Sequence, residues 1–151
     1  DGSWFYAETD YQRWIDSFHT GFNLMSLNYV NKLLQDPRIA ICIEKGEQFY
    51  RENFFLEDGT SKYFHDHTLP VDIHSAAMAL MYFSRNNDPV SMDLCAQIYR
   101  WLNSHMKNHD GSFAFQRGRF FTNRIPYMRW GQAWALYGLS HYLDKRKEDM
   151  V

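Results

Sequence analysis

The stretch IPYMRWGQAWALYGLSHYL, at Ile125–Leu143, carries the clearest helical pattern in the sequence. Aromatic and imidazole side chains recur in it every three or four residues, at Trp130, Trp134, Tyr137 and His141. This spacing places them along one face of a helix. Small residues lie between them, at Gly131, Ala133, Ala135 and Gly138. Since little side-chain bulk lets neighbours approach from several sides, the stretch predicts an inner helix of a helical array.

The same design occurs upstream with a fixed spacing. Asp36-Pro37 is followed after 22 residues by Asp58-Gly59, and Asp88-Pro89 after 22 residues by Asp110-Gly111, so the two frames lie 52 residues apart. A third Asp-Gly opens the sequence at Asp1. Each Asp-Gly leads through an aromatic stretch and a loop to a helix of small residues; these helices are expected to begin near His19, His74 and Trp130. A unit that recurs at a fixed period indicates a repeat architecture.

Cap and breaker signals divide the chain into alternating inner and outer helices. We expect helices over residues 16–34, 36–54, 72–85 and 88–108, with Asp16, Asp36 and Asp88 at the N-caps. A histidine-rich loop is expected over residues 60–71. Within residues 112–126 phenylalanines alternate with polar residues, which indicates a short β-hairpin.

The sequence therefore predicts an all-α fold of α/α-hairpins. Hairpins that bury their faces only against neighbours form a solenoid or close into a toroid. We expect a single domain, 1–151, of about three helical hairpins. Because a closed ring needs roughly five to seven hairpins, these would form about half of an α/α toroid, as its C-terminal part. A second copy in a homodimer, or an N-terminal half, would complete the ring, since exposed apolar ends are unfavourable.

Composition excludes some partners and leaves others open. The net charge of -2 argues against a nucleic-acid partner, and no apolar run approaches the length of a membrane span. The 12 Phe, 10 Tyr and 5 Trp residues fill gaps between helices or, alternatively, line a sugar-binding cleft. Cys42 and Cys95 fall in the two predicted outer helices, and we expect both to be reduced core residues without a disulfide. The cellular location stays open, with the cytoplasm slightly favoured.

Several motifs resemble those of known toroid proteins. Asp1-Gly2-Ser3-Trp4 resembles the turn that repeats in α/α toroids of the terpenoid-cyclase type. Gly131-Gln132-Ala133-Trp134 with Tyr137-Gly138 is similar to the signature of unsaturated glucuronyl hydrolases, which are six-hairpin α/α barrels; their arginine directly precedes the glycine, whereas Arg129 lies two residues before it. The segments WIDSFHTGF, DGTSKYFH, VDIHSAA and IPYMRWGQAW resemble bacterial toroid proteins associated with polysaccharide metabolism. The resemblance implies an α/α toroid that processes carbohydrate.

Polar residues gather where the three inner helices begin. In a ring of hairpins these helix ends share one rim, so residues far apart in sequence would converge there. The predicted catalytic residues are the two Asp-His pairs Asp16, His19, Asp72 and His74. The predicted substrate-binding residues are Tyr127, Arg129, Trp130, Gln132, His65 and His67. The alternative interpretation is structural: the aspartates cap helices, the histidines and aromatic residues pack, Arg129 pairs with an acidic loop, and Gln132 bonds a neighbouring hairpin.

The segment His65-Asp66-His67 carries the one metal-like pattern. In an extended segment both imidazoles point the same way, and Asp72 or His74 would complete a set of ligands. No HExxH or CxxC spacing accompanies it, and His-x-His alone is a weak signal. We therefore expect no metal, and the sequence contains no phosphate-loop or dinucleotide-binding motif that would imply a cofactor.

Two functions remain in competition at this point. The favoured one is a toroid segment acting on polysaccharide or a uronic-acid-type sugar through Asp/His acid-base chemistry. Hydrolase, lyase and epimerase activities all remain open, because each can be built from carboxylate, imidazole and arginine. The alternative is a non-catalytic helical-repeat module that binds glycan or protein through the same rim.

Overall fold

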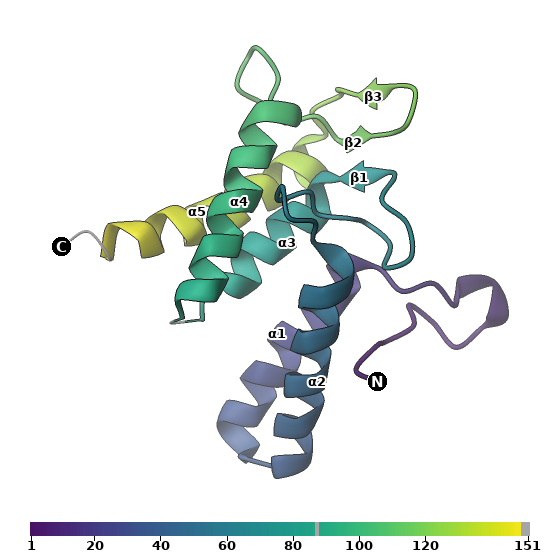
Figure 1. Cartoon of the computed structure of the whole chain (residues 1–151), viewed down its shortest axis with the longest axis vertical. Coiled ribbons are helices and arrows are strands. Elements are labelled where there is room, and N and C mark those ends of the chain that lie inside the picture. Colours follow the sequence, from purple (N-terminus) through teal and green to yellow (C-terminus); the bar gives the residue numbers. More distant parts are fainter. Residues whose placement is uncertain (87, 149–151) are drawn as a thin grey trace.

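Five long helices account for most of the computed structural model, which describes residues 1–86 and 88–148 (Figure 1). They are α1 (Ser17–Leu34), α2 (Pro37–Phe54), α3 (Ile73–Phe83), α4 (Pro89–His105) and α5 (Ala133–Glu148). Shorter elements are a 3₁₀ turn, η1 (Asp10–Gln12), a π-helical turn, η2 (Met128–Gln132), and the strands β1 (Val71–Asp72), β2 (Gln116–Arg117) and β3 (Thr122–Asn123). The predicted all-α fold class is confirmed.

The starts of the helices follow from local side-chain chemistry. Asp16, Asp36, Asp72 and Asp88 each precede a helix, and the side chain of each accepts a backbone N–H of the first turn. Such a cap satisfies one of the amide groups that a helix start leaves without a partner. Pro37 and Pro89 then occupy the first turns of the two outer helices, where proline removes no helical hydrogen bond. The three N-caps expected from the sequence are confirmed.

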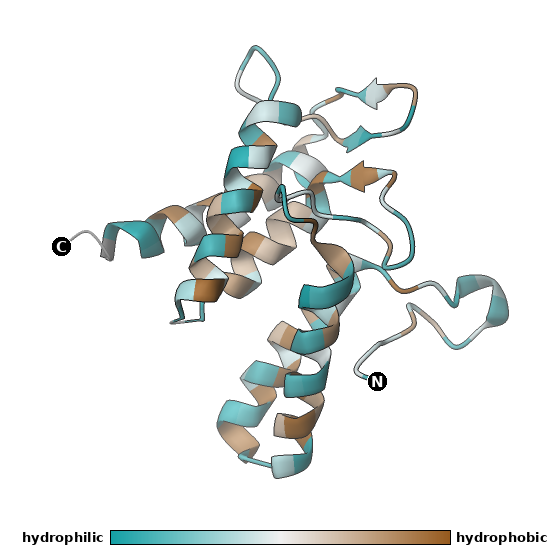
Figure 2. Ribbon diagram, in the orientation of Figure 1, coloured by the Kyte–Doolittle hydropathy of each residue, from teal (hydrophilic) through white to brown (hydrophobic). Residues whose placement is uncertain are grey.

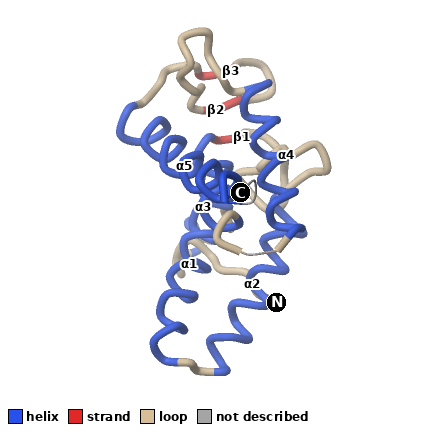
Figure 3. The backbone as a smooth tube through the Cα atoms, turned by 90° about the vertical axis from the view of Figure 1, so that its left-hand side faces the viewer, coloured by secondary structure: helices blue, strands red, loops and turns tan. Residues whose placement is uncertain are grey.

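Helix α3 lies at the centre of the molecule. It packs against α1, α4 and α5, while α2 packs on α1 (Figure 3). All of its residues except His74 are buried. Figure 2 accordingly shows α3 in brown tones along most of its length, whereas α4 alternates between teal and brown. Thus α1, α3 and α5 are inner helices, and α2 and α4 are outer helices. Of the third predicted hairpin, the described residues contain only the inner helix, α5.

Three Asp-Gly turns repeat with the same geometry. Gly2, Gly59 and Gly111 have φ angles of 94°, 90° and 87°, a region that glycine adopts without steric cost. In each turn the aspartate side chain accepts the backbone N–H two residues later. A β-carbon at Gly2 would lie 2.2 Å from the Lys45 carbonyl oxygen, and one at Gly59 would lie 2.4 Å from that of Gln97. Since Lys45 and Gln97 are 52 residues apart, the first two turns dock at the same position of the outer helix that follows each of them.

A small antiparallel sheet joins two distant loops. In it β1 pairs with β2 and β2 with β3, in the register Val71↔Arg117, Asp72↔Gln116 and Arg117↔Thr122. Strands β2 and β3 form the short hairpin that the sequence predicts. Strand β1 was not expected, because two residues are too few to show an alternating pattern.

A partly buried polar network joins α2, α3 and α4. Glu47 accepts hydrogen bonds from Arg51 at 2.7 Å and from the Tyr82 hydroxyl at 2.8 Å. Arg51 also donates to Ser91 Oγ at 2.5 Å, and Ser91 donates to the cap residue Asp88 at 2.6 Å. The charged groups on this side of α2 therefore fasten neighbouring hairpins together instead of facing solvent alone.

The two cysteines differ in environment. Both are free, as expected; Cys95 is buried, but Cys42 is exposed, so the prediction that Cys42 is a core residue is wrong. The 52-residue shift aligns Cys95 with Ile43, and Cys42 lies one residue further round its helix. Within residues 1–86 and 88–148, no helix is both long enough and apolar enough to cross a membrane.

Candidate active site

A cavity of about 530 Å³ opens between the first turns of α1 and α3 and the turn η2 that leads into α5. It contains four of the ten predicted site residues: His19, His74, Arg129 and Trp130. Four aromatic residues from the loops and helices complete its lining: Tyr6, Phe18, Tyr63 and Trp134. Residues from the starts of all three inner helices therefore meet at one cavity, as the sequence predicts: His19 from α1, His74 from α3, and Arg129 and Trp130 from the turn before α5.

Asp16 and His19 form a single hydrogen-bonded unit at the start of α1. Asp16 Oδ1 accepts the His19 backbone N–H at 2.8 Å and lies 2.9 Å from His19 Nδ1. The Trp14 indole N–H donates to Asp16 Oδ2 at 3.1 Å, and Asp16 is only 1% exposed. Because an ionised carboxylate only accepts, the Nδ1 of His19 carries a proton and its Nε2 is left for other partners. The structural and the functional interpretation of Asp16 are thus compatible, since one carboxylate caps the helix and orients the imidazole.

Asp72 and His74 repeat this unit at the start of α3. Asp72 Oδ1 accepts the His74 backbone N–H at 2.8 Å and lies 2.6 Å from His74 Nδ1. The Gln116 amide donates to Asp72 Oδ2 at 3.3 Å, which ties the unit to β2. The side chain of His74 is 13% exposed, against 43% for His19. The cavity therefore has one deep imidazole and one near its opening.

Phe18 lies between the two imidazoles. Its ring centroid is 5.4 Å from that of His19, 5.7 Å from that of His74 and 5.0 Å from that of Trp134, with all three rings edge-on. Edge-to-face packing of this kind fixes the relative orientation of aromatic groups. Phe18 therefore sets the separation of the two Asp-His units, a role that its position beside His19 in the sequence did not reveal.

Tyr63 lines the cavity from the 60–71 loop. Burial, together with the nearby carboxylates of Asp16 and Asp72, raises the pKa of Tyr63 to about 12. Its phenol therefore stays protonated across the neutral range and can donate a hydrogen bond to a ligand oxygen. The backbone carbonyl of Tyr63 accepts the Ser17 N–H, which fixes the 60–71 loop to the start of α1.

Arg129 and Trp130 reach the cavity from the π-helical turn η2. Such turns are rare and often lie at functional sites. Trp130 is 68% exposed, and its ring stands edge-on to His74 at 6.5 Å. A β-carbon at Gly131 would lie 3.2 Å from Ile73, so the missing side chain lets the turn approach the start of α3.

Gln132 anchors the same turn to the loop before β2. Its side-chain oxygen accepts the Phe113 backbone N–H at 2.9 Å, and its amide donates to the Phe113 carbonyl at 2.7 Å. Tyr127 does not contact His74 directly. Its ring packs on Phe115, and the ring of Phe115 contacts His74. Neither residue lines the cavity, but Gln132 fixes the turn that carries Arg129 and Trp130.

The two histidines of the 60–71 loop lie outside the cavity, although Tyr63 of the same loop lines it. The His65 ring lies beside Phe49 of α2, while His67 lies 2.6 Å from Asp66 and stacks on Phe64. Neither histidine lines the cavity. Across residues 1–86 and 88–148, no three His, Cys, Asp or Glu side chains lie close enough together to hold a metal ion.

The arrangement is suited to proton transfer. A pair of imidazoles, each oriented by a buried carboxylate, can accept a proton at one position of a ligand and deliver one at another. The phenol of Tyr63 and the guanidinium of Arg129 can donate hydrogen bonds to ligand oxygens, and the indoles of Trp130 and Trp134 offer surfaces for stacking.

Comparison with known proteins identifies the fold. No protein-family model and no curated protein matches the sequence. Among solved structures, the cellobiose 2-epimerase from Bacillus thermoamylovorans superposes on 97% of this chain with a TM-score of 0.74 at 10% identity. The cellobiose 2-epimerase from Spirochaeta thermophila superposes on 89% of it with a TM-score of 0.69 at 11% identity. The matched regions amount to 45% and 39% of those two chains. The protein described here thus has the fold of a partial α/α toroid of the kind found in these carbohydrate-processing enzymes.

Proposed function

We propose that this protein contributes the proton-transfer half of a sugar epimerase or isomerase site that acts at the reducing end of an oligosaccharide. The observation that carries the proposal is the pair of Asp-oriented imidazoles, His19 and His74, on one cavity with Phe18 between them. The similarity of this chain in fold to two cellobiose 2-epimerases favours a carbohydrate substrate and a reaction of this class.

The chemistry of epimerisation needs two proton-transfer groups. The hydrogen on the carbon next to a sugar carbonyl is acidic, so a base removes it and leaves an enediolate; an acid then returns a proton to the opposite face. One imidazole Nε2 would act as the base and the other, protonated, as the acid, with the roles exchanged in the reverse direction. Asp16 and Asp72 would stabilise each imidazolium as it forms.

Other cavity residues would bind the sugar. Tyr63 and Arg129 would donate hydrogen bonds to the enediolate oxygen, where negative charge develops. Trp130 and Trp134 would stack on the sugar rings through their apolar faces. The predicted roles of Tyr127 and Gln132 become indirect in this proposal, since neither residue lines the cavity.

Because this chain spans less than half of either epimerase, we infer that the cavity is one wall of a larger site. A second copy or further hairpins would supply the opposite wall. Light scattering on the 151-residue chain tests this directly: a dimer supports completion by a second copy, and a monomer supports completion by further hairpins.

Deuterium uptake tests the proposed reaction. Cellobiose is incubated with the protein in D₂O, and mass spectrometry with NMR follows a non-exchangeable deuterium and the epimer at C2. We expect uptake with the unmodified protein and a loss of about 10²-fold or more in His19→Gln and in His74→Gln. His67→Gln is the matched control, because its exposed ring lies outside the cavity.

The remaining outcomes separate the alternatives. Quenching of tryptophan fluorescence by the disaccharide without any uptake would favour the non-catalytic glycan-binding module. Release of glucose, or of an unsaturated sugar, would overturn epimerisation in favour of a hydrolase or a lyase. Uptake that is unchanged in both histidine variants would overturn the assignment of these two residues.

A further inference from the structure

The three-stranded sheet separates the candidate active site from a second cavity. Side chains alternate between the two faces of a strand. On one face Gln116 hydrogen-bonds to Asp72 beside His74; on the other, their neighbours Arg117 and Val71 line a separate cavity of about 720 Å³. None of its lining residues belongs to the first cavity.

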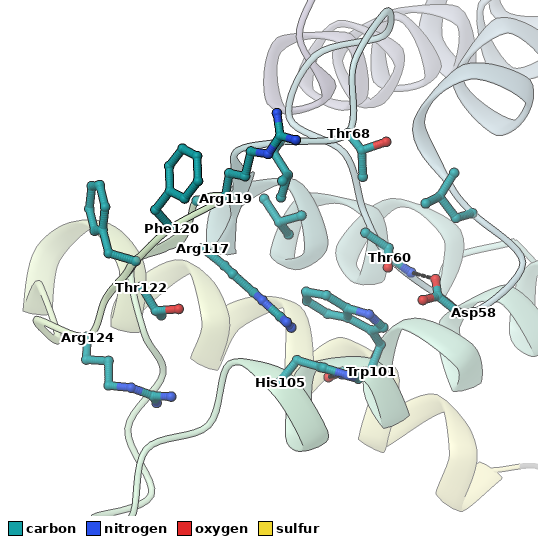
Figure 4. A pocket seen from close by; sticks show the side chains of 15 residues that line it. Asp58, Thr60, Thr68, Trp101, His105, Arg117, Arg119, Phe120, Thr122 and Arg124 are labelled. Carbon is teal, nitrogen blue, oxygen red and sulfur yellow. Dashed lines mark hydrogen bonds between the residues drawn. The ribbon is translucent and has the colours of Figure 1, made fainter.

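Four segments form the walls of the second cavity (Figure 4), one of which is the 68–71 stretch with Thr68, Leu69 and Val71. The end of α4 contributes Trp101 and His105, and the Asp-Gly turn after α2 contributes Asp58 and Thr60. The β2–β3 hairpin contributes Arg117, Arg119, Arg124 and the two phenylalanines Phe120 and Phe121. In Figure 4 the side chain of Arg117 extends across the cavity toward Trp101 and His105.

The charges in this cavity are unbalanced. Three guanidinium groups face a single carboxylate, that of Asp58. Hydrogen bonds from Thr60 hold the pKa of Asp58 below its ordinary value, and its carboxylate already accepts the Thr60 backbone N–H at 2.8 Å. Asp58 is therefore ionised, but its carboxylate stabilises the Asp-Gly turn and does not pair with an arginine.

None of the three arginines is neutralised by the described part of the chain. The Arg117 guanidinium has neither a hydrogen bond nor an ion pair with residues 1–86 and 88–148, although the residue is half-buried. Arg119 contacts the Phe120 ring at 5.7 Å, and Arg124 donates to the neutral Asn108 side chain at 3.1 Å. Guanidinium groups that line one cavity without counter-charges can bind a planar or tetrahedral oxyanion.

Aromatic and polar groups surround these charges. The Trp101 and His105 rings stack at 4.7 Å, and His105 Nδ1 donates to the Trp101 carbonyl at 3.0 Å, which leaves Nε2 for another partner. Phe120 and Phe121, by contrast, are 90% and 75% exposed at the edge of the cavity. Apolar ring faces beside hydrogen-bonding groups match the two kinds of surface that a pyranose presents.

We propose that this second cavity binds an anionic sugar, with its acidic group held by Arg117 and Arg124 and its ring packed against Phe120 and Phe121. The acidic group is a carboxylate, as in a uronate, or a phosphate, as in a sugar phosphate; both present the oxyanion that arginine recognises. Only the choice of a sugar rests on the function proposed above, since the requirement for an anion follows from the arginines alone.

Titration with small probes tests this proposal. Glucuronate, glucose 6-phosphate, glucose and inorganic phosphate are added in turn to the ¹⁵N-labelled chain at low salt, and NMR follows the indole N–H of Trp101 and the side-chain N–H groups of the arginines. We expect glucuronate or glucose 6-phosphate to bind, and neutral glucose not to bind at this cavity. The affinity should fall as salt increases. Whichever of the two binds more tightly identifies the acidic group.

Matched arginine variants locate the binding. Arg117→Gln should weaken binding of the anionic sugar by about tenfold or more, and Arg117→Lys should weaken it less because the charge remains without the planar fork. Arg100→Gln on α4 is the control, since Arg100 is exposed and does not line the cavity. Far-ultraviolet circular dichroism confirms that each variant is folded.

Three results would overturn the proposal. They are equal binding in Arg117→Gln and the unmodified chain, binding of inorganic phosphate as tight as that of glucose 6-phosphate, and shifts confined to residues outside the cavity. The signals of His19 and His74 report separately on cellobiose. A failure there with success at Arg117 would overturn the proposed function and leave the anion site standing.

Discussion

Gly59 lies so close to α4 that a β-carbon built on it would be 2.4 Å from the carbonyl oxygen of Gln97. Gly2 has the same relationship to Lys45 of α2, at 2.2 Å. Gly111 has the same backbone conformation, but nothing described in the structure lies within 4 Å of its β-carbon position. Gly2 and Gly59 thus meet two requirements for glycine, a positive φ angle and a close approach to a helix. Gly111 meets only the first of them, the positive φ angle.

This difference predicts unequal effects of alanine at the two positions. Gly111→Ala should lower the free energy of unfolding by about 1–2 kcal/mol, the cost of a left-handed conformation for a residue with a β-carbon. Gly59→Ala should lower it by about 3 kcal/mol or more, because the clash with the Gln97 backbone adds to that cost. Urea denaturation followed by circular dichroism measures both. Equal losses would mean that docking on α4 contributes nothing beyond the turn itself.

The acid sensitivity of the fold can be predicted from Asp88. Hydrogen bonds from the Ser91 side chain and backbone, with Arg51 nearby, hold the pKa of Asp88 below its ordinary value. The unfolded chain therefore takes up this proton first as the pH falls below about 4. The stabilisation from Asp88 is complete above that pH and is lost as the pH falls through the folded-state pKa.

Asp88→Asn separates this effect from that of other carboxylates. The variant keeps a capping side chain but cannot titrate, so its free energy of unfolding should fall less steeply as the pH drops below about 4. Asp93→Asn, an exposed change on the same helix, is the control. If the Asp88 variant loses stability with acid as steeply as the unmodified chain, the Ser91 contacts do not couple protonation to folding.

The sequence was most informative where structure depends on neighbouring residues. Asp-Pro pairs and Asp-Gly turns act within a few residues, so the helix starts, the repeat and the partial toroid could all be predicted. The Asp16–His19 spacing matches an N-cap and its third helical residue, which is why that pair was recognisable. Cys42 was misplaced because a shift of one residue in the repeat alignment moves a side chain to another face of the helix.

Tertiary contacts account for what could not be predicted. Tyr6 and Tyr63 reach the cavity from loops whose paths depend on the sheet and on the Ser17 contact, and neither loop has a periodic pattern. In the sequence, the arginines of the second cavity are ordinary polar residues of a hairpin. Only the tertiary fold places Trp101 and Asp58 beside them. Hydrogen bonding of Gln132 to a neighbouring hairpin was expected as the structural alternative, but its partner Phe113 lies 19 residues away and could not be identified from the local sequence.

The contact between Asp72 and His74 provides a final prediction, because it combines capping with orientation of the ring. Asp72→Asn preserves an oxygen for the His74 backbone N–H, and Gln116 can turn its amide to meet the new NH₂ group. Asparagine caps helices about as well as aspartate, so the free energy of unfolding should change by only about 0.5 kcal/mol. The negative charge that strengthens the 2.6 Å bond to Nδ1 is lost, however. We therefore expect the strongly deshielded Nδ1 proton of His74 to move upfield in the NMR spectrum, and deuterium uptake from D₂O into cellobiose to fall by about 10²-fold or more.

Asp36→Asn is the control for this prediction, because it changes a cap that has no imidazole partner and should leave both readouts unchanged. A large loss of stability in Asp72→Asn with an unmoved His74 signal would instead mean that Asp72 serves the fold alone.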